Sequence, residues 1–173
     1  MSETSKNIVK FVCLLIIGCS FGYQESGAIA KPILHHNSSE LAPQSLRLEI
    51  SRSRRRVTVY YQNTAIKSYP VAVGRAGWET PIGNFQVMQM LKNPTWIHPL
   101  TDEVIPGGTP ANPLGNYWIG FWTNGTNWIG FHGTPNPNSV GRAASHGCIR
   151  MYNKDIEELF HLVSPGTPVT VVP

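Results

Sequence analysis

Alternating hydrophobic and polar positions begin near residue 47 and recur, with breaks, to the end of the chain. The segments 47–51 and 56–62 alternate residue by residue, which is typical of strands that bury one face. A short polar turn then leads into a third apolar segment, 66–74. The pattern predicts a β meander, followed after a glycine- and proline-punctuated loop by another strand at 85–90.

Two later segments, 116–122 and 127–133, share the sequence WIGF and are separated by the residues TNGT. The Asn-Gly pair in this linker is the strongest short-range signal for a β-hairpin, because both residues tolerate a positive φ. We therefore expect two paired strands in similar environments. The second of them brings His132 to a strand end.

One helix is expected, in the C-terminal half of the chain. Apolar residues recur there at i, i+3, i+4 and i+7 over residues 154–163, and Asn153 is a suitable N-cap. A closing strand is expected at 168–172. The segment 92–115 holds five prolines and three glycines in 24 residues, which predicts a long binding loop or lid that contains Trp96.

Composition fits one mostly β domain: the chain has 173 residues, of which 41% are hydrophobic and 14% are charged. Its net charge is +4 at pH 7, and much of the positive charge lies in the sequence RSRRR at 52–56. This cluster favours either an anionic surface as a partner or a solvated turn at a sheet edge.

The N-terminal segment, 1–30, is typical of a secretory signal peptide. Lysines precede the apolar run 11–19, which is shorter than the roughly 20 residues that span a bilayer, and Ala28-Ile29-Ala30 fits a cleavage site. The residues that end at Cys19 also resemble a lipoprotein signal, so a lipid anchor at Cys19 stays an alternative. Residues 31–45 predict a linker. An exported chain is expected in the periplasm or cell envelope, and nucleic acid is not an expected partner.

Beyond this predicted signal, Cys148 is the only cysteine, so it cannot form an internal disulfide. It is an intermolecular bridge, an inert buried thiol or a reactive thiol. His132 and His146 are both candidates to lower its pKa, and Gly147 would let the amides of Gly147 and Cys148 turn toward an oxyanion. A metal site is the alternative use of these side chains, but their spacing fits no common zinc pattern. No metal or other cofactor is expected.

The segment 130–151, GFHGTPNPNSVGRAASHGCIRM, resembles the active-site signature of the L,D-transpeptidase catalytic domain (YkuD) family. In that signature a histidine precedes a Ser/Thr-His-Gly-Cys element by about fifteen residues. The likeness extends over roughly residues 46–172, including GWETPIGNFQV and the closing strand. It implies a catalytic domain at 46–173 with the family's mostly β sandwich and one helix.

The resemblance also implies a reaction. Members attack the peptide bond between a diamino acid and the terminal D-residue of a peptidoglycan stem, form a cysteine thioester and pass the acyl group to an amine of a second stem, which gives a 3→3 cross-link. Peptidoglycan stems are then the substrates, and carbapenem-type inhibitors are expected. An L,D-carboxypeptidase or another cell-wall cysteine hydrolase is the nearest alternative. A wall-binding or metal-binding module without turnover is another.

Carried over residue by residue, the signature implies specific roles. Cys148 matches the nucleophile, His132 the residue that takes its proton, and Gly133 the carbonyl that supports the imidazole. The other matching or candidate positions are a second histidine, small oxyanion-side residues, a basic residue and a possible substrate contact: His146, Ser145, Gly147, Arg150 and Trp96.

Overall fold

The computed structural model describes residues 46–98 and 101–173. The predicted signal peptide, the predicted linker and Cys19 lie outside the described residues. Within them, the chain is mostly β with a single α-helix, as the sequence predicts. No helix in this described part has the length and apolarity needed to cross a membrane.

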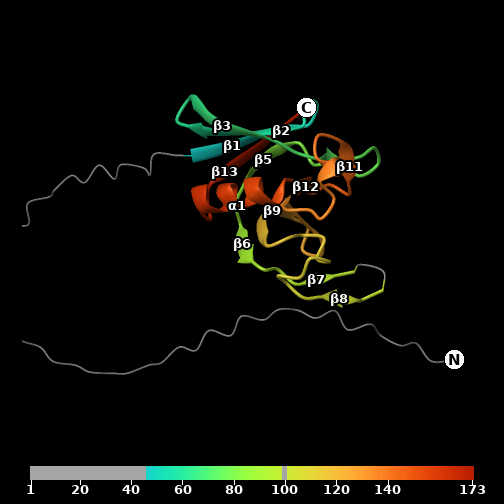
Figure 1. Cartoon of the computed structure of the whole chain (residues 1–173). Helices are drawn as coiled ribbons and strands as arrows, with labels where there is room; N and C mark the ends of the chain where they lie inside the picture. Colours follow the sequence, from blue (N-terminus) through green and yellow to red (C-terminus); the bar gives the residue numbers. More distant parts are fainter. Residues whose placement is uncertain (1–45, 99–100) are drawn as a thin grey trace, which may run out of the picture. The chain divides into compact units, whose positions relative to one another are not determined.

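Two main sheets form the domain (Figure 1). The five-stranded sheet has the order β3-β2-β1-β13-β5, with β1 (Leu46–Ser51), β2 (Arg56–Tyr61), β3 (Thr64–Pro70), β5 (Gly83–Gln86) and β13 (Pro168–Val172). The four-stranded sheet has the order β12-β10-β9-β6, with β6 (Gln89–Lys92), β9 (Tyr117–Thr123), β10 (Trp128–His132) and β12 (Ile149–Arg150). The smaller elements are β4 (Val73–Gly74), β7 (Trp96–Ile97), β8 (Val104–Ile105), β11 (Ala143–Ser145), the short helix η1 (Pro137–Ser139) and α1 (Asn153–Leu162).

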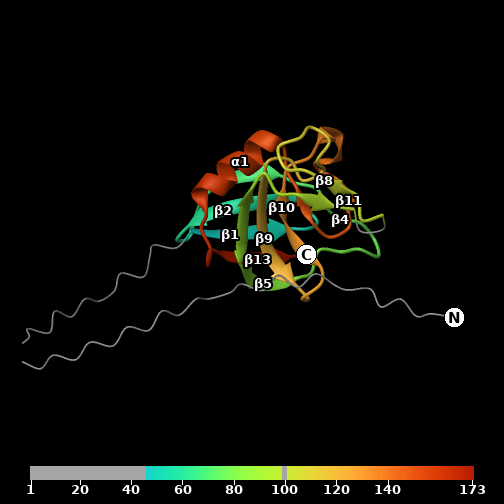
Figure 2. The ribbon, with the colours of Figure 1, turned by 90° about the horizontal axis from the view of Figure 1, so that it is seen from below.

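The core lies between the two sheets, and β9 and β10 run across β1 and β2 in Figure 2. Because strand side chains alternate between faces, every second residue of β2 and β13 is buried, whereas β9 and β10 each bury four consecutive residues. The buried residues include Leu48, Ile50, Val57, Val59, Ile119, Phe121, Phe131 and Val169. Each large side chain of this kind stabilises the fold by about 1.5–3 kcal/mol on full burial.

The predicted meander is confirmed, since β1, β2 and β3 pair antiparallel. Two other predicted strands are wrong in extent, because each divides between two sheets. The segment 66–74 ends its first strand at Pro70 and resumes as β4, which pairs in parallel with β11. The segment 85–90 divides into β5 and β6, because the Met88 amide donates to the Gly120 carbonyl at 2.8 Å and so carries the chain to the other sheet.

The predicted helix is present, but its predicted N-cap is wrong. Tyr152 is the N-cap residue, and Asn153 is the first residue of α1. The Asn153 side chain instead accepts a hydrogen bond from the Thr134 amide at 2.9 Å. α1 packs against β9 and β10 through buried Ile156 and Leu159. This packing brings the start of the helix next to the segment that follows β10.

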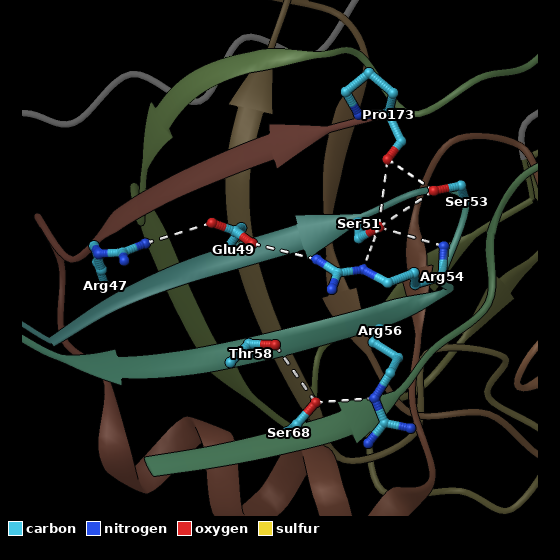
Figure 3. A network of polar contacts seen from close by, with 9 residues as sticks. All are labelled: Arg47, Glu49, Ser51, Ser53, Arg54, Arg56, Thr58, Ser68 and Pro173. Carbon is cyan, nitrogen blue, oxygen red and sulfur yellow. Dashed lines mark hydrogen bonds and ion pairs between the residues drawn. The ribbon is translucent and has the colours of Figure 1, made fainter. Parts of the chain in front are cut away.

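The arginine-rich turn between β1 and β2 forms a local polar network (Figure 3). Arg54 lies 3.7 Å from Glu49 and also donates to the Ser51 hydroxyl at 3.2 Å. Arg56 donates to Ser68 at 3.0 Å across the β2–β3 pair. These contacts fit the solvated-turn interpretation of the cluster.

The loop between β6 and β9 is organised by one buried amide side chain. Asn112 is 1% exposed. It donates to the carbonyls of Pro94 at 2.8 Å and Pro106 at 3.2 Å, and accepts from the Leu114 amide at 2.9 Å. A proline-rich segment offers few amides for regular structure, so this side chain supplies the missing cross-links.

We expect Asn112→Ala to lower the free energy of unfolding by about 1–3 kcal/mol, because it removes the side-chain partners of the buried Pro94 carbonyl and the Leu114 amide. Chemical denaturation measures the loss. The substitution should increase the hydrogen-exchange rate most at the Leu114 amide. Asn138, which is exposed in η1, offers the matched control Asn138→Ala. Equal stability of the two variants would contradict the assigned role of Asn112.

Candidate active site

The register between β10 and β12 brings distant polar residues to one face of the four-stranded sheet. The two strands are parallel, with Phe131 opposite Ile149 and His132 opposite Arg150. Phe131 and Ile149 are fully buried in the core. Side chains alternate along a strand, so His132 and Arg150 lie on the other face. By the same alternation, Cys148, one residue before Ile149, shares that face. Measured along the strand direction, it lies two residues, or roughly 7 Å, from the level of His132.

The Cys148 thiol is free and partly exposed. Its Sγ atom donates to the Trp128 carbonyl at 3.7 Å. Burial raises the pKa of the thiol, and the opposing effects of the Gly130 backbone hydrogen bond and the Arg150 charge are smaller. The lowered pKa predicted from the sequence is therefore wrong: the thiol of the free protein is neutral at pH 7.

His132 is buried, and its Nδ1–H donates to the Gly133 carbonyl at 2.6 Å, the support that the resemblance implies. This bond leaves Nε2 as the atom able to accept a proton. Burial lowers the pKa of His132 from 6.5 to about 4; the backbone hydrogen bonds to Gly133 and Pro113 oppose this shift, and the Arg150 charge adds to it. The ring also stacks on Trp118, with centroids 6.1 Å apart. The imidazole is therefore neutral and able to act as a base at pH 7.

Two further segments hold the His132–Gly133 unit: the end of the predicted binding loop and the start of α1. The Gly133 amide donates to the Leu114 carbonyl at 2.9 Å, at the end of the proline-rich loop. A Cβ atom on Gly133 would lie 2.2 Å from the Asn153 side-chain oxygen. Asn153 thus fixes both Gly133 and the following Thr134 amide. Its position in the sequence indicated a helix cap and gave no sign of this role.

A chain of hydrogen bonds locks the turn that carries Cys148. Gly147 has a φ of 112°, which favours glycine, and its amide donates to the Ser145 hydroxyl at 3.1 Å. The Ser145 hydroxyl donates in turn to the Cys148 carbonyl at 2.6 Å. Thr80 closes the chain by donating to the Gly147 carbonyl at 2.8 Å.

This network corrects two predicted roles. The Gly147 amide is already bonded, so it is not available to an oxyanion in this conformation. Ser145 is 1% exposed, so its hydroxyl shapes the turn and does not form a substrate surface. Within residues 46–98 and 101–173 the Cys148 amide donates no hydrogen bond, so it is available to an oxyanion that forms beside the thiol.

His146 lies on the solvent side of the same turn. Arg75 Nη2 contacts its Nε2 at 2.7 Å, and Trp78 meets its ring edge-on at 4.9 Å between centroids. Partial burial lowers the pKa of His146, and the charges of Arg75 and Arg150 lower it further. The contacts of this histidine are thus with the loop before β5, and it is not bonded to the Cys148 thiol.

The remaining predicted residues divide between the site and elsewhere. Arg150 lies in the site, since its charge affects the pKa of His132, His146 and Cys148. Trp96 pairs with Ile105 in the β7–β8 ribbon and contacts His98 at 5.2 Å between ring centroids. None of these contacts joins Trp96 to the other predicted site residues. Among the described residues, no group of three or more His, Cys, Asp or Glu side chains could hold a metal ion.

The repeated WIGF sequence has a structural explanation at this face. Gly120 and Gly130 lie opposite each other on β9 and β10. A Cβ on Gly130 would lie 2.8 Å from the Trp118 ring, and one on Gly120 would lie 2.9 Å from its indole nitrogen. Both glycines therefore make room for Trp118, which stacks on His132. Trp122, after a β-bulge, packs against the core instead.

We expect the alkylation of Cys148 by iodoacetamide to accelerate continuously from pH 6 to above pH 8.5, the usual thiol pKa, because burial raises the pKa of this thiol. Mass spectrometry of the Cys148 peptide gives the rate at each pH. The same measurement on unfolded protein in urea is the control, and it should show a lower midpoint. A rate that is already constant at neutral pH would indicate a preformed thiolate–imidazolium pair and contradict this result.

The family model for the L,D-transpeptidase catalytic domain (YkuD) matches residues 45–171. The chain is 36% identical over 127 residues to the putative L,D-transpeptidase YkuD of Bacillus licheniformis, covering 73% of this chain and 66% of that protein. It is 37% identical over 124 residues to the putative L,D-transpeptidase YqjB of Bacillus subtilis, covering 70% of this chain and 68% of that protein. The chain thus spans about two thirds of the length of these relatives.

Solved structures show the same fold. The L,D-transpeptidase 3 of Mycobacterium tuberculosis, in complex with a faropenem-derived adduct, superposes with a TM-score of 0.60 at 20% identity, covering 75% of this chain and 60% of that one. The catalytic domain of the Enterococcus faecium L,D-transpeptidase superposes with a TM-score of 0.57 at 24% identity, covering 75% of this chain and 98% of that one. The sheets and the helix described above are therefore an arrangement that these domains share.

Proposed function

Because the chain belongs to the L,D-transpeptidase catalytic domain family, we propose that it is an exported acyltransferase that forms 3→3 cross-links between peptidoglycan stems through a thioester on Cys148. One observation supports the proposal: β12, which directly follows Cys148, pairs in parallel with the end of β10 that carries His132, and the imidazole is oriented by the Gly133 carbonyl.

The two neutral side chains suit a mechanism in which the proton moves during the attack. The Cys148 thiol rotates from the Trp128 carbonyl toward the imidazole, and Nε2 of His132 takes its proton as sulfur bonds to the carbonyl carbon of the diamino acid. The Cys148 amide donates to the oxyanion. When the tetrahedral intermediate collapses, the bond to the D-residue breaks, and His132 returns the proton to its departing amine.

The second half of the reaction reverses these roles. The side-chain amine of a second stem attacks the thioester, loses a proton to His132 and forms the new amide bond. The thiolate leaves and is protonated by the imidazolium. Water in place of the amine would release the free acid, which is the alternative carboxypeptidase activity.

The test is a reaction of the purified protein with a synthetic tetrapeptide stem, in the presence and absence of an acceptor stem, followed by mass spectrometry. Transpeptidation predicts a thioester on Cys148, release of the D-residue and a cross-linked product. Release of the D-residue without a cross-link would favour the carboxypeptidase, and absence of any adduct would overturn the proposal. Imipenem, present in one of the similar solved structures, should form an adduct on the same cysteine.

We also propose that the protein acts in the periplasm or cell envelope, as the pattern of residues 1–30 supports. Mass spectrometry of the mature N-terminus from membrane and soluble fractions tests this. A terminus after Ala30 would support simple cleavage, and a lipidated Cys19 would support the alternative anchor. An intact N-terminus on a protein that stays inside the cell would contradict export.

A further inference from the structure

A cluster of three side chains outside the catalytic pair lies on the solvent side of the nucleophile turn. It consists of Arg75, Trp78 and His146, joined by the 2.7 Å contact between Arg75 Nη2 and His146 Nε2 and by the edge-on ring contact of Trp78. A guanidinium group only donates hydrogen bonds, so the Nε2 atom of His146 accepts. The histidine is therefore neutral in this contact, and the cluster keeps the full positive charge of Arg75.

The cluster is held in a fixed position relative to Cys148. The Arg75 amide donates to the Ser145 carbonyl at 3.1 Å, and the Trp78 amide donates to the Arg75 carbonyl at 2.9 Å. The Thr80 hydroxyl, which accepts from the Gly74 amide at 3.1 Å, donates to the Gly147 carbonyl. The loop that carries Arg75 is thus bonded at both ends to the turn that carries the nucleophile.

No carboxylate of the described residues neutralises Arg75. The ion pairs found within residues 46–98 and 101–173 join Arg47 and Arg54 to Glu49, and Lys67 to Glu158. Glu79, the acid of the same loop, accepts from the Gly77 amide at 3.0 Å. A second guanidinium, that of Arg150, is close enough to affect His146.

The surroundings of Arg75 suit a peptide ligand. A guanidinium has five N–H donors in a planar fork, so the contact with His146 leaves others available to a carboxylate. Trp78 is 55% exposed and offers an apolar surface next to them. An unpaired cation beside an exposed indole, both fixed to the nucleophile turn, is the arrangement expected for a substrate anion with an apolar neighbour.

We propose that Arg75, oriented by His146 and flanked by Trp78, binds a carboxylate of the peptide substrate next to Cys148. The inference rests on the proposed function for its substrate class. Two carboxylates belong to the residues on either side of the scissile bond: that of the terminal D-residue, and the second carboxylate of the diamino acid, beside its side-chain amine. Binding either one would place the scissile carbonyl relative to the thiol.

The test measures binding without turnover, in a Cys148→Ala background, so that it does not depend on catalysis. Isothermal titration calorimetry compares Arg75→Gln with the parent, using a tetrapeptide stem and two analogues in which one or the other carboxylate is an amide. We expect Arg75→Gln to weaken binding of the free stem by about 10- to 100-fold, the usual effect of losing a charge-assisted hydrogen bond. The analogue whose amide replaces the bound carboxylate should bind parent and variant equally, which identifies the source.

Arg56→Gln is the matched control, because it removes the same charge from an exposed arginine bonded to Ser68. It should leave all three affinities unchanged. His146→Gln should weaken binding of the free stem less than Arg75→Gln does. The amide analogue that abolishes the effect of Arg75→Gln should also abolish the effect of His146→Gln. If Arg75→Gln lowered the affinity for all three ligands equally, or lowered none of them, the carboxylate site would be overturned. Failure of the proposed function would appear separately, as absence of a Cys148 thioester in the unmodified protein.

Discussion

The Cys148→Ala variant is expected to lose stem cross-linking by about 10⁴-fold or more, since Cys148 is the only thiol among residues 46–98 and 101–173 that could form the thioester on which both half-reactions depend. The variant should also fail to form the imipenem adduct. Mass spectrometry after incubation with stems or with imipenem gives both results. The loss should occur without unfolding, because Cys148 is partly exposed and lies outside the hydrophobic core.

Two measurements separate this outcome from its alternatives. The melting temperature of Cys148→Ala should equal that of the unmodified protein, so that a lost reaction is not lost structure. Binding of the stem should persist, as the calorimetric test requires. Residual cross-linking within tenfold of the unmodified protein would mean that Cys148 is not the nucleophile, and the turn around it would then be structural only.

The sequence predicted the strands best where one face is buried throughout. β1, β2 and β13 match their predicted positions, because apolar side chains alternate along them and all belong to the same sheet. The segments that became β3–β4 and β5–β6 also carry strand-like patterns of apolar and polar residues from one end to the other. A change of sheet leaves the pattern intact, so only the partner strands reveal it.

The candidate site could be predicted in its chemistry but not in its bonding. The residue types and the resemblance indicated His132 and Cys148 as partners, and the register of β10 and β12 explains how the segments that carry them, sixteen positions apart, come together. The partners of Ser145 and Gly147 could not be predicted, because Thr80 comes from a distant loop. The role of Asn153 could not be predicted either, because a helix cap and a side chain that hydrogen-bonds a neighbouring loop require the same residue type.

Burial reverses the simplest expectation for the catalytic pair. A thiol beside a histidine suggests an ion pair, yet burial raises the pKa of the thiol and lowers that of the imidazole. Both shifts favour the neutral forms. The neutral thiol is expected to react slowly with oxidants, because these react with the thiolate.

Replacing His132 by glutamine is expected to lower the rate of Cys148 acylation by about 10²- to 10⁴-fold, the usual contribution of a general base. Glutamine keeps a polar side chain of similar size but cannot take the proton. Acylation by imipenem, followed by stopped-flow absorbance, measures the rate below and above the thiol pKa. The deficit should shrink at high pH, where hydroxide supplies the thiolate. A deficit that is the same at every pH would indicate lost positioning instead.

The same substitution should change how stability depends on pH. The pKa of His132 is about 4 in the folded protein and near 6.5 when unfolded, so between these values the unfolded chain binds one more proton. The free energy of unfolding of the unmodified protein should therefore fall by about 3 kcal/mol as the pH drops from above 6.5 to about 4. His132→Gln lacks this group and should lose less stability over that range, by urea denaturation at pH 7.5 and 4. Other titrating groups are present in both proteins, so the difference between their losses of stability isolates the buried imidazole. Equal losses in the two proteins would mean that the ring is accessible to protons in the folded state.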